Sequence, residues 1–158
     1  MSKICSCFGK AKNLNKNGLE ESLFVFYEHL IKEQGFDVFC FGGVGEFDNL
    51  CFKVVLSLKE KYSKIKTVLV FPNVKWAKID FDDEFKNKFD ECVRIEKESD
   101  DLKLPLLSRN FEMAKASEFI VFFASETGRG SETKVFEFAK EKNIPYINFY
   151  WFLITQNL

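Results

Sequence analysis

Residues 37–62 read DVFCFGGVGEFDNLCFKVVLSLKEKY, and this stretch decides the fold. Its first part, Asp37–Phe41, is a short apolar run that Gly42-Gly43 follows directly. Over Phe47–Tyr62 the apolar residues recur at intervals of three and four, which is the spacing of an amphipathic helix. A buried strand, a glycine turn and a helix in this order predict one strand–helix unit of a parallel sheet.

The same alternation of apolar runs and amphipathic segments continues along the chain. We expect strands at Ile4–Phe8, Asp37–Phe41, Thr67–Phe71, Cys92–Ile95, Phe119–Ala124 and Pro145–Tyr150. We expect helices over Leu19–Gln34, Phe47–Tyr62, Asp83–Asp90, Ser108–Ala116, with Ser108 as its cap, and Ser131–Lys142. The pattern predicts an α/β fold: a Rossmann-like three-layer sandwich with a mainly parallel sheet of five or six strands. All 158 residues are expected to form one domain.

Composition restricts the class of function. The net charge of −1 disfavours a protein that binds nucleic acid through a basic face, but it leaves room for a small phosphate pocket. The five cysteines form no CxxC pair and the single histidine, His29, is distant, so we expect free thiols and no metal site. No apolar run is long enough to span a membrane, and Met1–Lys10 is too weakly apolar for a signal peptide. A cytoplasmic location is expected.

Ligands of parallel sheets bind beyond the carboxyl ends of the strands, so the loops there hold the candidate site. Glycines let the backbone approach a ligand closely, helix-start amides favour anions, and arginine suits phosphate or carboxylate. A plain turn, a capped helix or an exposed salt bridge would also explain each motif. The candidate ligand-binding residues are Gly9, Lys10, Gly42, Gly43, Gly45, Asp48, Arg109, Asn110, Gly128, Gly130, Ser131 and Thr133.

Three acids and one aromatic residue near these loops complete the set. Asp48, Glu46 and Glu132 are candidate acids, Asp48 for a ribose hydroxyl or a base edge, although acids at helix starts also complement the helix dipole. Trp76 either stacks on a base or packs under its loop. The charged segment Asn73–Leu107 is a candidate lid.

The ordered motifs over residues 4–149 resemble the SLOG superfamily, which includes the DprA/Smf proteins and the Lonely-guy phosphoribohydrolases, and within it the YpsA-like branch. The resemblance rests on the glycine turns after the first, second and fifth strands, on Arg109-Asn110, and on Ile144-Pro145. It implies a Rossmann-like sheet, a nucleotide or nucleotide-derived ligand and a homodimer.

Two departures from that pattern bear on function. By this resemblance, YpsA-like proteins carry Gly-His-Arg after the first strand, whereas here Gly9 is followed by Lys10-Ala11-Lys12. Lys134 stands at the position where the hydrolases carry an acid. We therefore expect a sensor or binding module for a nucleotide-like ligand, with no certain cofactor. The alternatives are an enzyme that cleaves an N-glycosidic or phosphoribosyl bond and a protein that binds single-stranded nucleic acid.

Overall fold

The computed structural model describes residues 2–9, 18–72, 81–95 and 105–151. Six parallel strands form one sheet in the order β4-β3-β2-β1-β5-β6. The strands are β1 (Ile4–Gly9), β2 (Val38–Phe41), β3 (Lys66–Pro72), β4 (Glu91–Ile95), β5 (Phe119–Phe123) and β6 (Tyr146–Asn148). The helices are α1 (Leu19–Lys32), α2 (Glu46–Lys61), α3 (Asp83–Lys86), α4 (Pro105–Lys115) and α5 (Ser131–Glu141).

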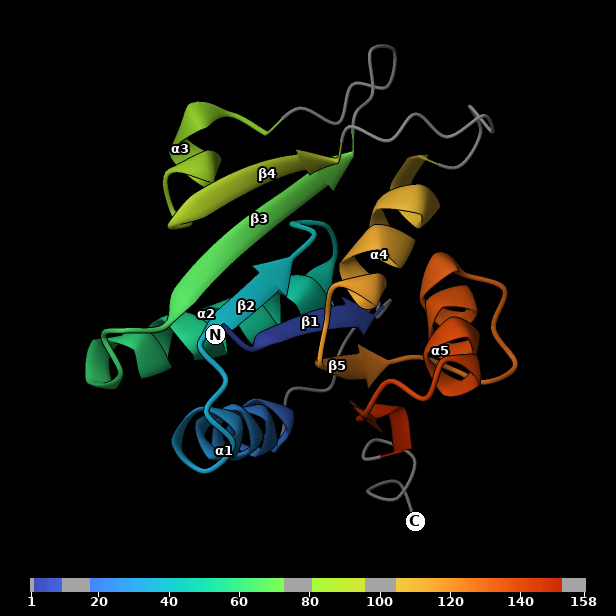
Figure 1. The fold of residues 1–158 in the computed structure, drawn as a ribbon, viewed down its shortest axis with the longest axis horizontal. Helices are drawn as coiled ribbons and strands as arrows, with labels where there is room; N and C mark the ends of the chain where they lie inside the picture. Colours follow the sequence, from blue (N-terminus) through green and yellow to red (C-terminus); the bar gives the residue numbers. More distant parts are fainter. Residues whose placement is uncertain (1, 10–17, 73–80, 96–104, 152–158) are drawn as a thin grey trace.

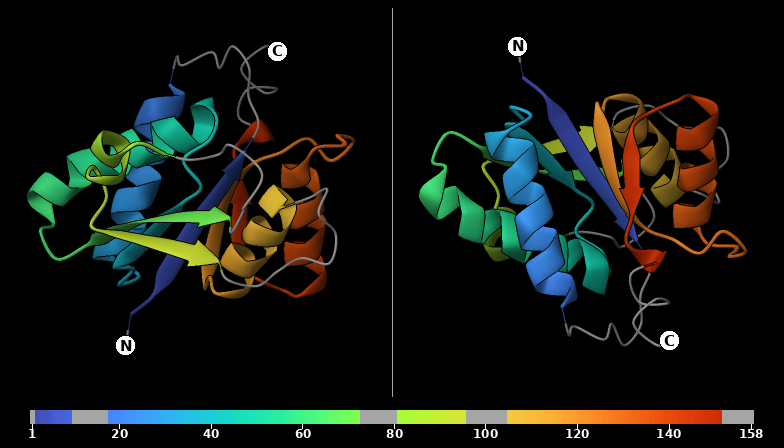
Figure 2. Two further views of the ribbon diagram at one scale, coloured as in Figure 1. Left: turned by 90° about the horizontal axis from the view of Figure 1, so that it is seen from above. Right: turned by 90° about the horizontal axis from the view of Figure 1, so that it is seen from below.

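The molecule has three layers, as the sequence predicts. Helices α1 and α2 cover one face of the sheet, α4 and α5 cover the other, and α3 lies beside β4 (Figures 1 and 2). Successive side chains of a strand point to opposite faces, so Cys7 lies in the core against α1 and α2 while Phe8 lies in the core against α4 and α5. This arrangement confirms the predicted Rossmann-like α/β fold.

Two helices differ from their predicted bounds by more than two residues. Helix α4 begins at Pro105, so Ser108 lies inside the helix and is not its cap. Proline is favoured in the first helical turn because its fixed φ suits a helix and its missing N–H needs no partner there. Helix α3 is only Asp83–Lys86, capped by Asp82, whose carboxylate accepts the Phe85 N–H at 2.8 Å.

Phenylalanine rings connect the elements on the α2 side of the sheet. Phe52 of α2 stacks on Phe89 at 4.2 Å between ring centroids, and Phe89 also contacts Phe41 of β2 and Phe85 of α3. Phe85 in turn stacks on Phe81 at 4.9 Å. This series of rings fixes α3 beside the β2–α2 loop and includes five of the 20 phenylalanines of the chain.

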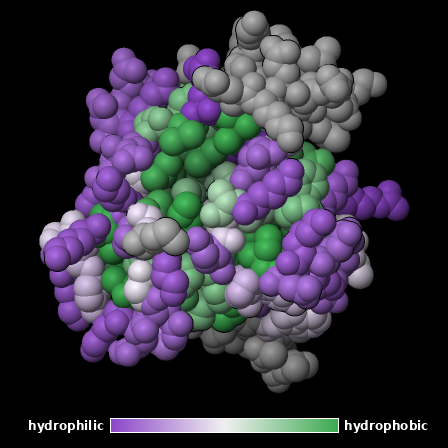
Figure 3. Space-filling model, viewed as in Figure 1, coloured by the Kyte–Doolittle hydropathy of each residue, from purple (hydrophilic) through white to green (hydrophobic). Residues whose placement is uncertain are grey.

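On the α4 side, apolar side chains gather over β3 and β4 beside α4 (Figure 3). Val70 of β3 is buried there, whereas Val93 of the edge strand β4 stays 42% exposed. Among the described residues, no helix is long and apolar enough to cross a membrane.

Gly9, at the carboxyl end of β1, has no room for a side chain. A Cβ there would lie 2.5 Å from the Phe47 ring and 2.9 Å from Cβ of Phe123. The missing side chain lets Phe47, at the start of α2, pack on Phe123 of β5, with 5.4 Å between ring centroids. Gly9 therefore sets how closely α2 lies over the centre of the sheet.

We expect Gly9→Ala to lower the free energy of unfolding by about 1–3 kcal/mol, the usual cost of overpacking a core. Phe47→Leu removes the ring atoms nearest that Cβ, so the double variant should lose less stability than the two single losses together. Urea unfolding of the four proteins measures this coupling. Additive losses would show that Gly9 is not required for the approach of Phe47.

Candidate functional site

The parallel sheet brings the predicted glycine loops to one edge. All strands point the same way, so the segments after β1, β2 and β5 leave the sheet at its carboxyl edge. The chain reverses its direction of winding between β1 and β5, which are neighbours in the sheet. Ligands of open α/β sheets bind beside such a reversal, so this edge is the candidate functional site.

The β2–α2 loop is closed by a carboxylate of its own chain. Asp48, in the first turn of α2, accepts the N–H groups of Gly42 and Gly43, both at 2.9 Å. Cys7 of β1 donates its thiol to the same carboxylate at 3.7 Å. Asp48 thus takes the two amides that the glycine motif offers to an anion.

Gly43 and Gly45 have backbone conformations that favour glycine. Their φ angles are +75° and +99°, in the region that costs residues with a Cβ about 1–2 kcal/mol. Gly43 also lies against Phe81, two residues before α3, since a Cβ on Gly43 would stand 2.9 Å from that ring. The loop shape therefore depends on glycine even where no ligand is bound.

Arg109 reaches this loop from the second turn of α4, not from the helix start that the sequence suggested. Its Nη1 donates to the carbonyls of Gly42 at 2.9 Å and Val70 at 3.2 Å, and its Nε donates to Asn110 Oδ1 at 2.8 Å. Strand β3 continues past Leu69, the partner of the last residue of β2. The Val70 carbonyl lies beyond the end of β2, and Arg109 supplies a donor to it.

The guanidinium lies flat against Gly42, because a Cβ there would be 2.9 Å from both Cζ and Nη2 of Arg109. Only 5% of Arg109 is exposed. Nη2 has no hydrogen-bond partner in the part of the chain that the structure describes.

Burial shifts the pKa of both charged groups. Desolvation raises the pKa of Asp48 from 3.8 to about 6, although the hydrogen bonds from Gly42 and Gly43 and the charge of Arg109 oppose the rise. Desolvation also lowers the pKa of Arg109 to about 10, against the attraction of Asp48. Arg109 is therefore charged at neutral pH, and Asp48 titrates just below it.

The β5–α5 loop is the second candidate segment. Thr133 donates its hydroxyl to the Ser125 carbonyl at 2.8 Å, which ties the first turn of α5 to the end of β5. The helix cap is Gly130, and the Glu132 carboxylate lies so close that a Cβ on Gly130 would clash with it. This loop places amides and one acid at the start of α5.

The predicted residues therefore fall into two groups. One cluster contains Gly42, Gly43, Asp48, Arg109 and Asn110, with Gly9 and Gly45 beside it. The other contains Gly128, Gly130, Ser131 and Thr133. Lys10 and Trp76 lie outside the described residues, as do positions 73–80 and 96–104, about half of the proposed lid Asn73–Leu107.

Sequence reasoning missed three partners at this edge: the Cys7 thiol and the carbonyls of Val70 and Ser125. Two of these are backbone groups, which carry no sequence signal. Cys7 lies on the same side of β1 as Gly9, so strand alternation places it beneath α2.

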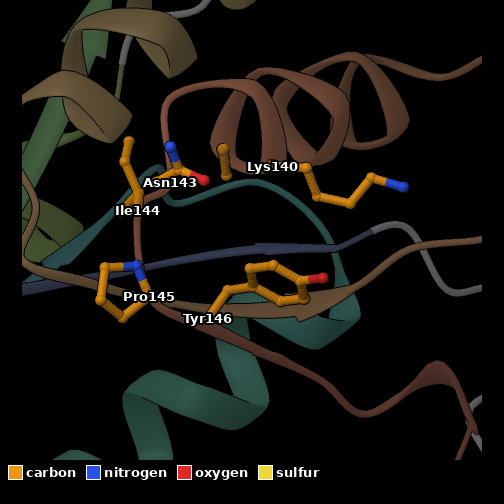
Figure 4. Close-up of a pocket in the computed structure, with 6 residues that line it drawn as sticks. Lys140, Asn143, Ile144, Pro145 and Tyr146 are labelled. Atoms are coloured by element: carbon orange, nitrogen blue, oxygen red, sulfur yellow. The ribbon is translucent and has the colours of Figure 1, made fainter.

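An open depression of about 430 Å³ lies elsewhere, between the end of α5 and the start of β6 (Figure 4). It is lined by Ala139, Lys140, Asn143, Ile144, Pro145 and Tyr146. Asn143, at φ +55°, ends the helix, and the Ile144 N–H donates to the Ala139 carbonyl at 2.9 Å. The depression is therefore the outside of a helix end at the amino edge, away from the predicted loops.

Two solved structures are similar to this chain. The X-ray structure of TM1055, a Northeast Structural Genomics Consortium target, shares 14% identity at a TM-score of 0.53, over 91% of this chain and 72% of that one. The Moco carrier protein from Chlamydomonas reinhardtii shares 14% identity at a TM-score of 0.49, over 92% and 75%. No protein-family model and no curated protein matches the sequence. At this identity the likeness to TM1055 shows a common Rossmann-like fold.

The raised pKa of Asp48 predicts a pH dependence of stability. Between about pH 4 and pH 6 the folded chain holds a proton that the unfolded chain releases. The contribution of Asp48 to the free energy of unfolding therefore falls as pH rises through this window, by roughly 3 kcal/mol at 1.4 kcal/mol per pH unit. The Asp48→Asn variant should lack this decline, which urea unfolding at several pH values measures.

Nuclear magnetic resonance titration of the Asp48 carboxyl carbon gives an independent check. We expect a midpoint near pH 6, and a higher one in Arg109→Gln, because the guanidinium charge lowers the Asp48 pKa. A midpoint near pH 4 in the native protein would contradict the assignment.

Proposed function

We propose that this chain binds a nucleotide or nucleotide-derived small molecule at the carboxyl edge of the sheet. The observation that carries the proposal is the buried guanidinium of Arg109, which Gly42, Val70 and Asn110 hold at this edge while Nη2 has no partner among the described residues. A fixed cation at this edge suits a phosphate or carboxylate group.

The glycine helix caps support the same proposal. Gly45 and Gly130 start α2 and α5 without a side-chain oxygen, so neither cap residue satisfies the first amides of its helix. Such helix starts favour anions. We assign the phosphate to Arg109 and the Gly128–Ser131 loop, with Thr133 holding that loop. Gly42, Gly43 and Asp48 shape the site, because Asp48 already accepts the two glycine amides.

We further propose that the chain is a single SLOG domain, as its ordered motifs suggest, of the YpsA-like branch. Lys134, which stands where the related hydrolases carry an acid, is exposed on α5. This favours binding or sensing over cleavage of an N-glycosidic bond.

Ser131→Asp tests the proposal without touching the core. Ser131 is the first residue of α5, where an acid stabilises a helix by about 0.3–1 kcal/mol but repels a bound phosphate. We expect the variant to be as stable as the native protein yet to lose most ligand affinity. Ser63→Asp, at the opposite edge after α2, is the matched control.

Thermal-shift screening measures this with mono-, di- and cyclic nucleotides and nicotinamide or ADP-ribose derivatives. A ligand at about a hundred times its Kd adds roughly 2.7 kcal/mol to the stability of the folded protein. The shift should persist in Ser63→Asp and vanish in Ser131→Asp. If no compound raises Tm, or if both variants respond alike, the proposed site is wrong. Release of ribose 5-phosphate would favour the hydrolase instead.

A further inference from the structure

Strand β6 forms one edge of the sheet. It is the last strand in the sheet order and pairs with β5 on one side alone among the described residues. Figure 2 shows it beside β5 at the margin of the sheet. An edge strand presents a row of backbone N–H and carbonyl groups that an extended chain can pair with.

The hydrogen bonds to β5 show which groups of β6 face outward. The Pro145 carbonyl accepts an N–H of β5 at 3.0 Å, and the Phe149 N–H donates to a carbonyl of β5 at 2.8 Å. Backbone groups of successive strand residues point to alternate sides, so those of Tyr146 and Asn148 point away from β5. Within the described parts of the chain, these outward N–H and carbonyl groups have no hydrogen-bond partner.

The depression of about 430 Å³ lies against the start of this edge (Figure 4). Ala139, Ile144 and Pro145 give it an apolar lining. The Tyr146 ring lies on the same side of the sheet, because it packs edge-on against Phe136 of α5 with 5.0 Å between ring centroids. Tyr146 remains 40% exposed. The depression therefore adjoins the outward backbone of Tyr146 and is open to a side chain of an added strand.

One cation stands at this depression. Of the six described residues that line it, Lys140 alone is charged, and its Nζ lies 5.1 Å from the centroid of the Phe136 ring. The same ring thus contacts both Lys140 and Tyr146. In paired strands, side chains directly opposite each other share a face and lie about 4.5–5.5 Å apart. A residue opposite Tyr146 would therefore stand on the side of Lys140, where a carboxylate is favoured.

We propose that this edge binds an extended peptide segment of another protein by strand addition, with an aspartate or glutamate opposite Tyr146. The outward backbone groups of β6 pair with a chain in β conformation, and Lys140 selects the acid. This inference is independent of the proposed nucleotide site, which lies at the carboxyl edge of the sheet.

Two peptides, TVEVT and TVKVT, test the charge preference, because their β-branched residues favour an extended chain. Proton–nitrogen correlation NMR of the full chain, titrated to about 1 mM peptide, suits the weak affinity of a short segment that orders on binding. We expect TVEVT to shift the amide signals of Tyr146 and Asn148 and to slow their hydrogen exchange. TVKVT should bind roughly fivefold more weakly.

A charge reversal on the protein gives the matched variant. Lys140→Glu, in the last turn of α5, should make the chain prefer TVKVT over TVEVT. Lys32→Glu, the same change in the last turn of α1, should keep the native preference. A reversed preference cannot come from a loss of folding.

N-methylation of TVEVT at alternate residues separates strand addition from contact through side chains alone. An extended peptide presents alternate amides to one side, so one of the two methylated forms should lose binding and the other should keep it. Equal binding by both forms, no response at Tyr146 and Asn148, or a preference that Lys140→Glu leaves unchanged would overturn the proposal. The same amide shifts on concentrating the free chain would also overturn it, because they would assign this edge to a second copy.

Discussion

Gly42 is the residue whose two backbone hydrogen bonds hold the carboxyl edge together. Its N–H donates to Asp48 and its carbonyl accepts from Arg109, so one glycine satisfies two buried charges from two different helices. The acid and the base form no ion pair within 4 Å among the described residues, and each is hydrogen-bonded to the same residue, Gly42. Removing either partner leaves a buried charge exposed to a low dielectric, which typically costs several kcal/mol. No larger residue fits, because the guanidinium occupies the space of a Cβ.

This arrangement changes the meaning of the glycine motif. Consecutive glycines between a strand and a helix suggest a cradle for a bound phosphate. Here the chain provides the anion itself, since the carboxylate of Asp48 sits on the two amides. The chain's own hydrogen bonds therefore set the geometry of this loop, and no bound ligand is required for it. Among the described residues, the groups of this edge without such a partner are Nη2 of Arg109 and the first amides of α5, where Glu132 lies beside Gly130.

Local sequence patterns were sufficient to predict the layers of the fold but not the contacts of the candidate site. The strand Phe119–Phe123 and the helix Glu46–Lys61 follow from apolar spacing within one or two residues, because each depends on its own side chains. The burial of Arg109 depends on tertiary register. Strand β3 extends beyond the end of β2, so the Val70 carbonyl needs a donor, which α4 supplies. An arginine four residues after a proline gives no local sign of this. Pro105 marks the start of α4. The interpretation of Ser108 as the helix cap placed the predicted start three residues too late.

Parallel topology places the starts of the covering helices beside the candidate site. Helices α1 and α2 both begin at the carboxyl edge, since each follows a strand that ends there. Gly45 belongs to the loop that Asp48 and Arg109 hold, and it also begins α2. The β2–α2 loop therefore links the position of α2 over the sheet to the geometry of the candidate site.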